Sequence, residues 1–217
     1  MNDALNSGIG LCKGTDRLTL HPTAMTAEMG AGRDIVLKIL NLVHHINRQG
    51  APDDYIAVGL PEMHLMKERR LAGHTVELIG SEAVFDAMIA STGFIKLQRM
   101  QAILPPVRSK AELPTGETGM AFVRDRSTAK LGPAKLRRMQ KRAEEFGRSF
   151  EMPKNIERSD STLHALHYGQ AVLRIREIDG PVTDGPLQVT TYGFSHPAAP
   201  AFLPISRKKP QQIAIAA

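Results

Sequence analysis

Short alternating stretches and longer segments of helical spacing follow one another along the N-terminal half of the chain. The sequence DRLTLH at 16–21 alternates apolar and polar residues, which predicts a strand. Asp34 can cap the helix that follows, and Gly50 with Pro52 ends it. The apolar face of this helix is formed by Ile35, Val36, Ile39, Leu42, Val43 and Ile46. The pattern therefore predicts a strand and then an amphipathic helix.

The next segments extend this pattern. Residues 55–60 and 73–80 are short, apolar and bounded by turn residues, so each predicts a strand. Ser81 can cap a helix over 81–91, and 94–104 is expected as the last strand. The order βαββαβ is typical of a ferredoxin-like domain, which we expect at 1–104.

Prolines and glycines interrupt the periodicity after this point, at Pro105, Pro106, Pro114, Gly116 and Gly119. We therefore expect a linker at 105–119 and a second domain at 120–217, which gives an α+β protein overall. In the second domain, strands are predicted at 120–125, 171–178 and 186–194. Pro133 suits the first turn of a helix that runs to about Gly147, and the tail after Pro204 is expected to be disordered.

The charge balance favours an acidic partner. The chain of 217 residues has 28 lysines and arginines against 22 aspartates and glutamates, a formal net charge of +6. Nucleic acid is the commonest partner of such a protein, although composition alone does not distinguish RNA from a membrane surface.

Cysteine and hydropathy patterns limit the chemistry. Cys12 is the single cysteine, and the sequence contains no CxxC or HExxH, so we expect no disulfide, no metal site and no cofactor. The sequence has no apolar run of about 18 residues, so we expect no membrane span. These patterns together predict a soluble, cytoplasmic protein.

The predicted helix after Pro133 has a basic face. At 100 degrees per residue, one side carries Leu136, Met139, Ala143 and Phe146, which we expect to pack. The other side carries cations opposed only by Glu144 and Glu145. A solvated surface is the ordinary interpretation of a basic run, but this poorly neutralised row favours RNA phosphates. The expected RNA-binding residues here are Lys130, Lys135, Arg137, Arg138, Lys141 and Arg142.

Several motifs in order resemble one family. A histidine-bearing helix precedes IAVGLP at 56–61; RDRSTAK at 124–130 precedes KLRRMQKR at 135–142; GPLQV at 185–189 precedes YGFS at 192–195. Taken together, these motifs resemble the CRISPR repeat-cleaving endoribonucleases of type I-F systems, which process the precursor of CRISPR RNA (crRNA). The resemblance covers most of the chain between Leu42 and Ser195, and the ferredoxin-like expectation agrees with that family's N-terminal domain.

The resemblance implies a catalytic histidine and a tyrosine. In the family the histidine precedes the proline of the strand by sixteen residues, and counting back from Pro61 reaches His45. His44 misses by one, so we interpret it as a solvent-facing or helix-terminal histidine. His45 is then the base or proton-transfer residue. The resemblance also implies that Tyr192 lies at the site, although a half-buried strand tyrosine is the ordinary alternative.

A histidine suits RNA cleavage because the ribose 2'-hydroxyl is a built-in nucleophile. A neutral imidazole, with a pKa of about 6.5, can remove that proton at neutral pH, and attack on phosphorus leaves a cyclic phosphate without a metal ion.

Two positions depart from the family. Arg124 and Arg126 match linker residues that read the base of the repeat hairpin, but the second is usually glutamine, and arginine suits guanine. The family often has a serine that holds the attacking ribose, where this chain has Ala165 and His167. Ser161, Thr162, His164 and His167 are the alternatives for that role.

The resemblance implies a metal-independent endoribonuclease that cuts 3' of the repeat stem-loop and stays bound to the mature crRNA. It would then join the other subunits of the type I-F surveillance complex. A non-catalytic hairpin-binding subunit and a ribosomal-type RNA-binding protein are the alternatives.

Overall fold

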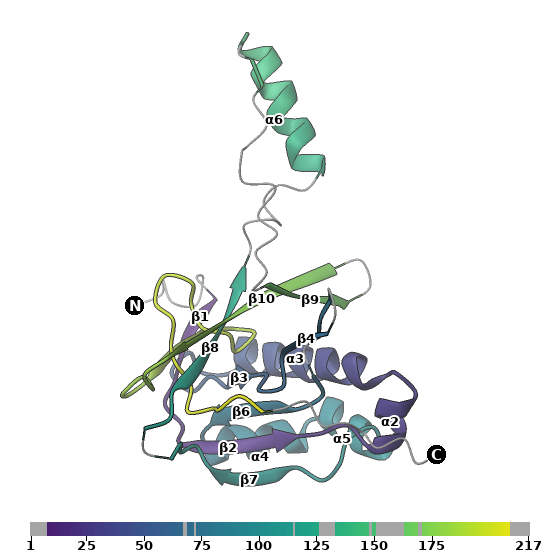
Figure 1. Ribbon diagram of the computed structural model, residues 1–217, viewed down its shortest axis with the longest axis vertical. Coiled ribbons are helices and arrows are strands. Elements are labelled where there is room, and N and C mark those ends of the chain that lie inside the picture. Colours follow the sequence, from purple (N-terminus) through teal and green to yellow (C-terminus); the bar gives the residue numbers. More distant parts are fainter. Residues whose placement is uncertain are drawn as a thin grey trace.

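The chain folds as an α+β protein with antiparallel sheets, as the sequence predicts (Figure 1). The computed structural model describes residues 8–66, 69–71, 73–114, 116–125, 133–147, 149–150, 163–168 and 171–208. Within these ranges, the backbone alone is described for 65–66, 69–71, 125, 133–136, 163–168 and 171–172. Arg126, Lys130, Ser161 and Thr162 lie outside the described residues.

The larger sheet has four strands in the order β3 (Ala57–Gly59), β6 (Val76–Gly80), β2 (Asp16–Leu20) and β7 (Val107–Lys110). All its pairings are antiparallel. Helices α3 (Gly32–Gln49), α4 (Glu82–Ala90) and α5 (Thr92–Arg99) lie behind it in Figure 1. Leu18 and Leu78 of the sheet are fully buried in one core with Ile39 and Phe85 of the helices, because the apolar helix faces turn toward the strands.

One expected strand is a helix. The segment expected as a strand at 94–104 contains most of α5, which begins after Ser91, whose hydroxyl accepts a hydrogen bond from the Phe94 amide at 3.3 Å. Phe94 and Leu97 are buried one helical turn apart. The cap and this spacing favour helix over strand, and the fourth strand comes later, as β7.

The C-terminal half forms a three-stranded sheet with the order β8 (Gly119–Asp125), β10 (Ala171–Gly180) and β9 (Leu163–Tyr168). The sequence predicted β8 and β10 but not β9. A separate pair joins β1 (Ile9–Cys12) to β11 (Leu187–Thr190). The remaining elements are α2 (Ala24–Glu28) and the hairpin of β4 (His64–Met66) with β5 (Arg69–Leu71).

The two halves of the chain share one core. Val107–Lys110, inside the range expected as a linker, pairs with β2, so the linker interpretation is corrected for these residues. Phe122 and Ile205 belong to the same buried cluster as Leu18. Buried side chains from both halves of the chain therefore pack in the same core.

The segment after Pro204 is ordered as far as Lys208, which corrects the expectation of a disordered tail. Ile205 is fully buried, and the Lys208 amide donates to the Pro61 carbonyl at 2.9 Å. The Lys208 ammonium also pairs with Glu77, which is 1% exposed at the side chain. Residues 209–217 lie outside the described part of the chain.

Helix α6 (Pro133–Glu145) occupies the predicted position and stands apart from the sheets in Figure 1. Arg137, Arg138, Lys141 and Arg142 are exposed, as expected. Met139 and Phe146, expected to pack, are 36% and 66% exposed. The prediction of a packed apolar face is therefore wrong for these two residues, because the described sheets stand apart from this helix (Figure 1).

Candidate functional site

Three segments that are distant in sequence meet at the ring of Tyr192. The ring of His44, from the C-terminal part of α3, stacks on it with 4.0 Å between centroids and 10° between planes. The guanidinium carbon of Arg124, near the end of β8, lies over the same ring at 4.8 Å from its centroid. The arrangement combines a proton acceptor, a cation and an aromatic platform.

Gly193 fixes the turn that carries Tyr192. Its φ of 78° is in the left-handed region that favours glycine. A Cβ at this position would lie 2.5 Å from a methyl carbon of Val58 and 2.8 Å from the Ile56 oxygen. The Val58 amide donates to the Gly193 carbonyl at 2.8 Å, so the turn is pressed onto the edge of β3.

Asn47 holds the end of α3 against the same strand. Its side-chain amide donates to the Ile56 carbonyl at 2.9 Å and accepts from the Ile56 amide at 2.8 Å. Asn47 is 1% exposed and lies three residues after His44, on a neighbouring face of the helix. Because the chain around β3 also holds the Tyr192 turn, it sets the distance between the two stacked rings.

Arg124 is positioned by β8. In the register it pairs with Ile175 of β10, which is fully buried. The neighbouring Val123 bridges Ser195, and the Ser195 amide donates to the Phe122 carbonyl at 2.8 Å. The end of β8 therefore runs beside the segment that follows Tyr192.

The environment of His44 keeps its imidazole neutral. Burial lowers the pKa of His44 below its ordinary value, and the positive charge of Arg48 lowers it further. The Thr191 backbone partly offsets this, while Arg124 and His45 add to the lowering of the pKa. The Nδ1 atom is buried and has no hydrogen-bond partner among the described residues. A neutral imidazole of this kind can accept a proton at neutral pH.

The structure brings His44, and not His45, onto Tyr192. His44 is half-buried and stacked on Tyr192, so the interpretation of its ring as solvent-facing is wrong, although the residue does lie in the C-terminal part of α3. His45 is exposed. Successive helical residues point about 100° apart, so only one of two adjacent rings can face the Tyr192 turn. Counting back from Pro61 assumed that no residue is inserted between helix and strand. The catalytic role of either histidine stays a prediction.

Sequence reasoning missed Arg48, Asn47 and Gly193. Arg48 is exposed and lies one turn after His44. If His44 had been chosen as the catalytic histidine, this spacing would have indicated that Arg48 lies near the site. Asn47 and Gly193 act through backbone contacts with β3. Glycine in the motif YGFS is the one sequence signal that pointed to a special turn.

The structure describes the other predicted residues to different extents. Arg137, Arg138, Lys141 and Arg142 lie on α6, which stands apart from the sheets in Figure 1. The backbone of Lys135 is described, and its side chain is not. His164 and His167 are on β9, for which the backbone alone is described.

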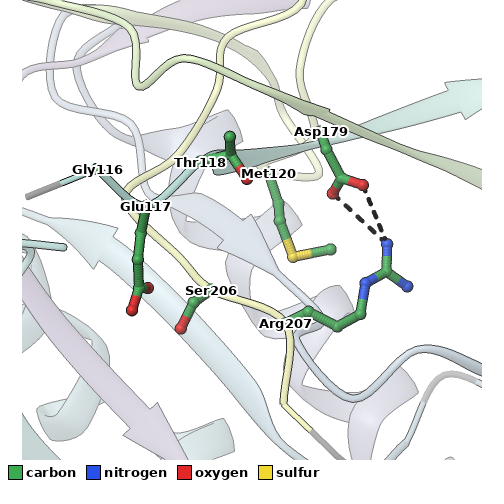
Figure 2. Close-up of a pocket in the computed structure, with 7 residues that line it drawn as sticks. All are labelled: Gly116, Glu117, Thr118, Met120, Asp179, Ser206 and Arg207. Atoms are coloured by element: carbon green, nitrogen blue, oxygen red, sulfur yellow. Dashed lines mark hydrogen bonds and ion pairs between the residues drawn. The ribbon is translucent and has the colours of Figure 1, made fainter. Parts of the chain in front are cut away.

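A separate pocket of about 320 Å³ lies between the start of β8 and the C-terminal segment (Figure 2). Figure 2 shows Arg207 directed at Asp179, and this guanidinium also pairs with Glu177 at 2.9 Å. Since Glu177 and Asp179 already compensate Arg207, the pocket offers little free positive charge for an anionic ligand.

Neither a metal cluster nor a membrane-spanning helix occurs in the part of the chain that the structure describes. No three histidine, cysteine, aspartate or glutamate residues there gather closely enough to hold a metal ion. None of the described helices has the length and apolar character that a membrane span requires.

No protein-family model matches the chain, and no curated protein shows significant similarity to it. The function is therefore inferred from the motifs and from the geometry around Tyr192.

Proposed function

We propose that the protein is a metal-independent endoribonuclease that binds and cuts a CRISPR repeat hairpin, in the manner of the type I-F family. The observation that carries the proposal is the stack of His44 on Tyr192 with Arg124 over the same ring. In this reaction a neutral histidine can act as the base and a cation can stabilise the phosphate, while the aromatic ring positions the histidine. Two of the three, Tyr192 and Arg124, are residues that the resemblance selected, although it assigned Arg124 to reading the base of the hairpin.

The fold is consistent with this proposal. The strand order β3-β6-β2-β7 supports a ferredoxin-like N-terminal unit. Along the chain, α3 follows β2, the first of these strands, and α4 precedes β7, the last of them. The histidine then lies on the first long helix of that unit, as the family resemblance implies.

In the proposed reaction, His44 takes the proton of the ribose 2'-hydroxyl. The oxygen attacks the adjacent phosphorus and the bond from phosphorus to the 5'-oxygen breaks, so the products are a 2',3'-cyclic phosphate and a 5'-hydroxyl. The leaving oxygen takes up one proton, so protons balance. Tyr192 holds the imidazole plane, and Arg124 adds positive charge beside the reacting phosphate.

Helix α6 supports a hairpin-binding role. Arg137, Arg138, Lys141 and Arg142 form an exposed basic set, which suits phosphates along a groove. A-form RNA has a deep, narrow major groove, so we expect binding near a loop, where the groove opens. Arg126 is proposed to read guanine at the base of the hairpin.

The register favours one replacement for the family serine. His164 pairs with Ile175, which pairs with Arg124 on the other side, so these residues form one row across the sheet. His167 pairs with Val172 instead and belongs to the alternate row. Since opposite residues share a face and neighbours alternate, His164 occupies the position on the Arg124 face.

If the protein stays bound to its cleaved product, it would be a subunit of a crRNA-guided complex. A non-catalytic hairpin-binding subunit is the second candidate, because Ala165 stands near the position where the family has serine.

The test is cleavage of an end-labelled repeat hairpin in excess EDTA. We expect cutting 3' of the stem, a cyclic phosphate on the 5' product and no cutting when the attacking nucleotide is 2'-deoxy. A 2'-deoxy substrate that is cut equally well would contradict the proposal. Tight binding without cleavage of the ribose substrate would favour the non-catalytic subunit.

A further inference from the structure

Arg48 is a cation without a described role beside the candidate site. It lies four residues after His44 in the last turn of α3, and residues at this spacing have Cβ atoms about 5–6 Å apart. Its side chain is exposed, and no ion pair of Arg48 occurs among the described residues. Arg17, Arg108 and Arg207, by contrast, each pair with a carboxylate.

The charges around His44 have one sign. The charged groups of the described residues that act on its imidazole are Arg48, Arg124 and His45, all potential cations. Arg124 is held over Tyr192, so it faces the same space as the stacked ring. Like charges gathered around a half-buried ring oppose one another, and an anion bound there would remove that repulsion.

We propose that Arg48 binds the scissile phosphate and is a catalytic residue of the cleavage reaction. The proposal rests on the proposed endoribonuclease function. An arginine fork can hold two phosphate oxygens at once, and its charge opposes the negative charge that develops on those oxygens as the 2'-oxygen attacks. Arg48 acts from the helix, and Arg124 from the sheet.

This position couples phosphate binding to proton transfer. In the free protein Arg48 lowers the pKa of His44, so the imidazole is neutral and ready to accept a proton. A bound phosphate compensates the guanidinium, which allows the imidazole to become positive as it takes the proton of the 2'-hydroxyl. Loss of Arg48 should therefore raise the pKa of His44 in the free protein.

The experiment compares wild type with Arg48→Ala and Arg48→Lys in single-turnover cleavage of the repeat hairpin in EDTA. Lys38→Ala is the control, since Lys38 is an exposed cation of the same helix about 15 Å away along its axis. We expect Arg48→Ala to slow cleavage about 100-fold, with Arg48→Lys intermediate and Lys38→Ala unchanged. The melting temperature should change little, because Arg48 is exposed. Hairpin affinity should fall far less than the cleavage rate, because the other cations still contact phosphates.

The pH profile separates a phosphate contact from a structural effect. Cleavage needs neutral His44, so the rate rises with pH through its pKa, and the acid limb should move to higher pH in Arg48→Ala. If wild type and Arg48→Ala cut the hairpin equally fast, the proposal for Arg48 would be overturned and the proposed endoribonuclease function would stand. A wild type that binds but never cuts would overturn the proposed function and this proposal together.

Discussion

At the scale of single residues, the candidate site depends on a few side chains and backbone angles that hold two rings together. Asn47 joins α3 to Ile56, and Gly193 joins the Tyr192 turn to Val58. Neither residue has chemistry of its own. The stack of His44 on Tyr192 is therefore a consequence of how tightly both segments are attached to the chain around β3.

Replacing Gly193 by alanine tests this attachment. The new Cβ would meet Val58 and Ile56 at a left-handed φ, so we expect a loss of about 1–3 kcal/mol in the free energy of unfolding and a large loss of cleavage. Gly185 is a matched control, with a φ of 82° and open space around it. Gly185→Ala should lose about 1 kcal/mol and retain cleavage. Urea unfolding and cleavage assays measure both, and equal losses of cleavage in the two variants would contradict the account.

The paired histidines show where sequence reasoning reaches its limit at this scale. Tyr192 and Arg124 were identified because they belong to motifs, and the structure brings them together. The choice between His44 and His45 depends on the rotation of α3 against β3, which buried Asn47 fixes through bonds to a residue nine positions away. A count along the chain contains no information on that rotation.

At the scale of elements, local patterns predicted β2, α3, β3, β6, α4, β8, α6, β10 and β11. Each has a cap, a periodic apolar face or a short apolar run bounded by turn residues. The failures have different causes. Residues of α5 were taken for a strand because Ile95 and Leu97 alternate with Lys96 and Gln98 over a few positions, although Phe94 and Leu97 have helical spacing. Strand β1 was not predicted, and no local pattern indicates its pairing with β11, which joins opposite ends of the chain.

The register of β9 gives a prediction about the missing serine. His164 belongs to the row of Ile175 and Arg124, and β9 lies beside α3 in Figure 1. We expect His164→Ala to lower the single-turnover cleavage rate at least about tenfold, because a group on this face can hold the ribose or protonate the leaving oxygen. His167→Ala, in the alternate row of the same strand, should have little effect. A rate that falls for His167→Ala and stays unchanged for His164→Ala would contradict this use of the register.

At the scale of the whole molecule, the N-terminal and C-terminal halves build the site together. His44 comes from one half, and Tyr192 and Arg124 from the other. The segment around Ile205 and Lys208 closes over the four-stranded sheet, with Lys208 paired to buried Glu77. Composition and domain-boundary signals predicted the α+β class but could not predict this shared core, because burial across halves depends on long-range packing.

The measurement that tests the central claim most directly compares His44→Ala with His45→Ala in metal-free cleavage of the repeat hairpin, with binding measured in parallel. If the ring stacked on Tyr192 accepts the proton, His44→Ala should lose cleavage about 100-fold or more while still binding the hairpin. His45→Ala should cut nearly as well as wild type, since its ring is exposed. Cleavage that is lost in His45→Ala and kept in His44→Ala would contradict the site described around Tyr192.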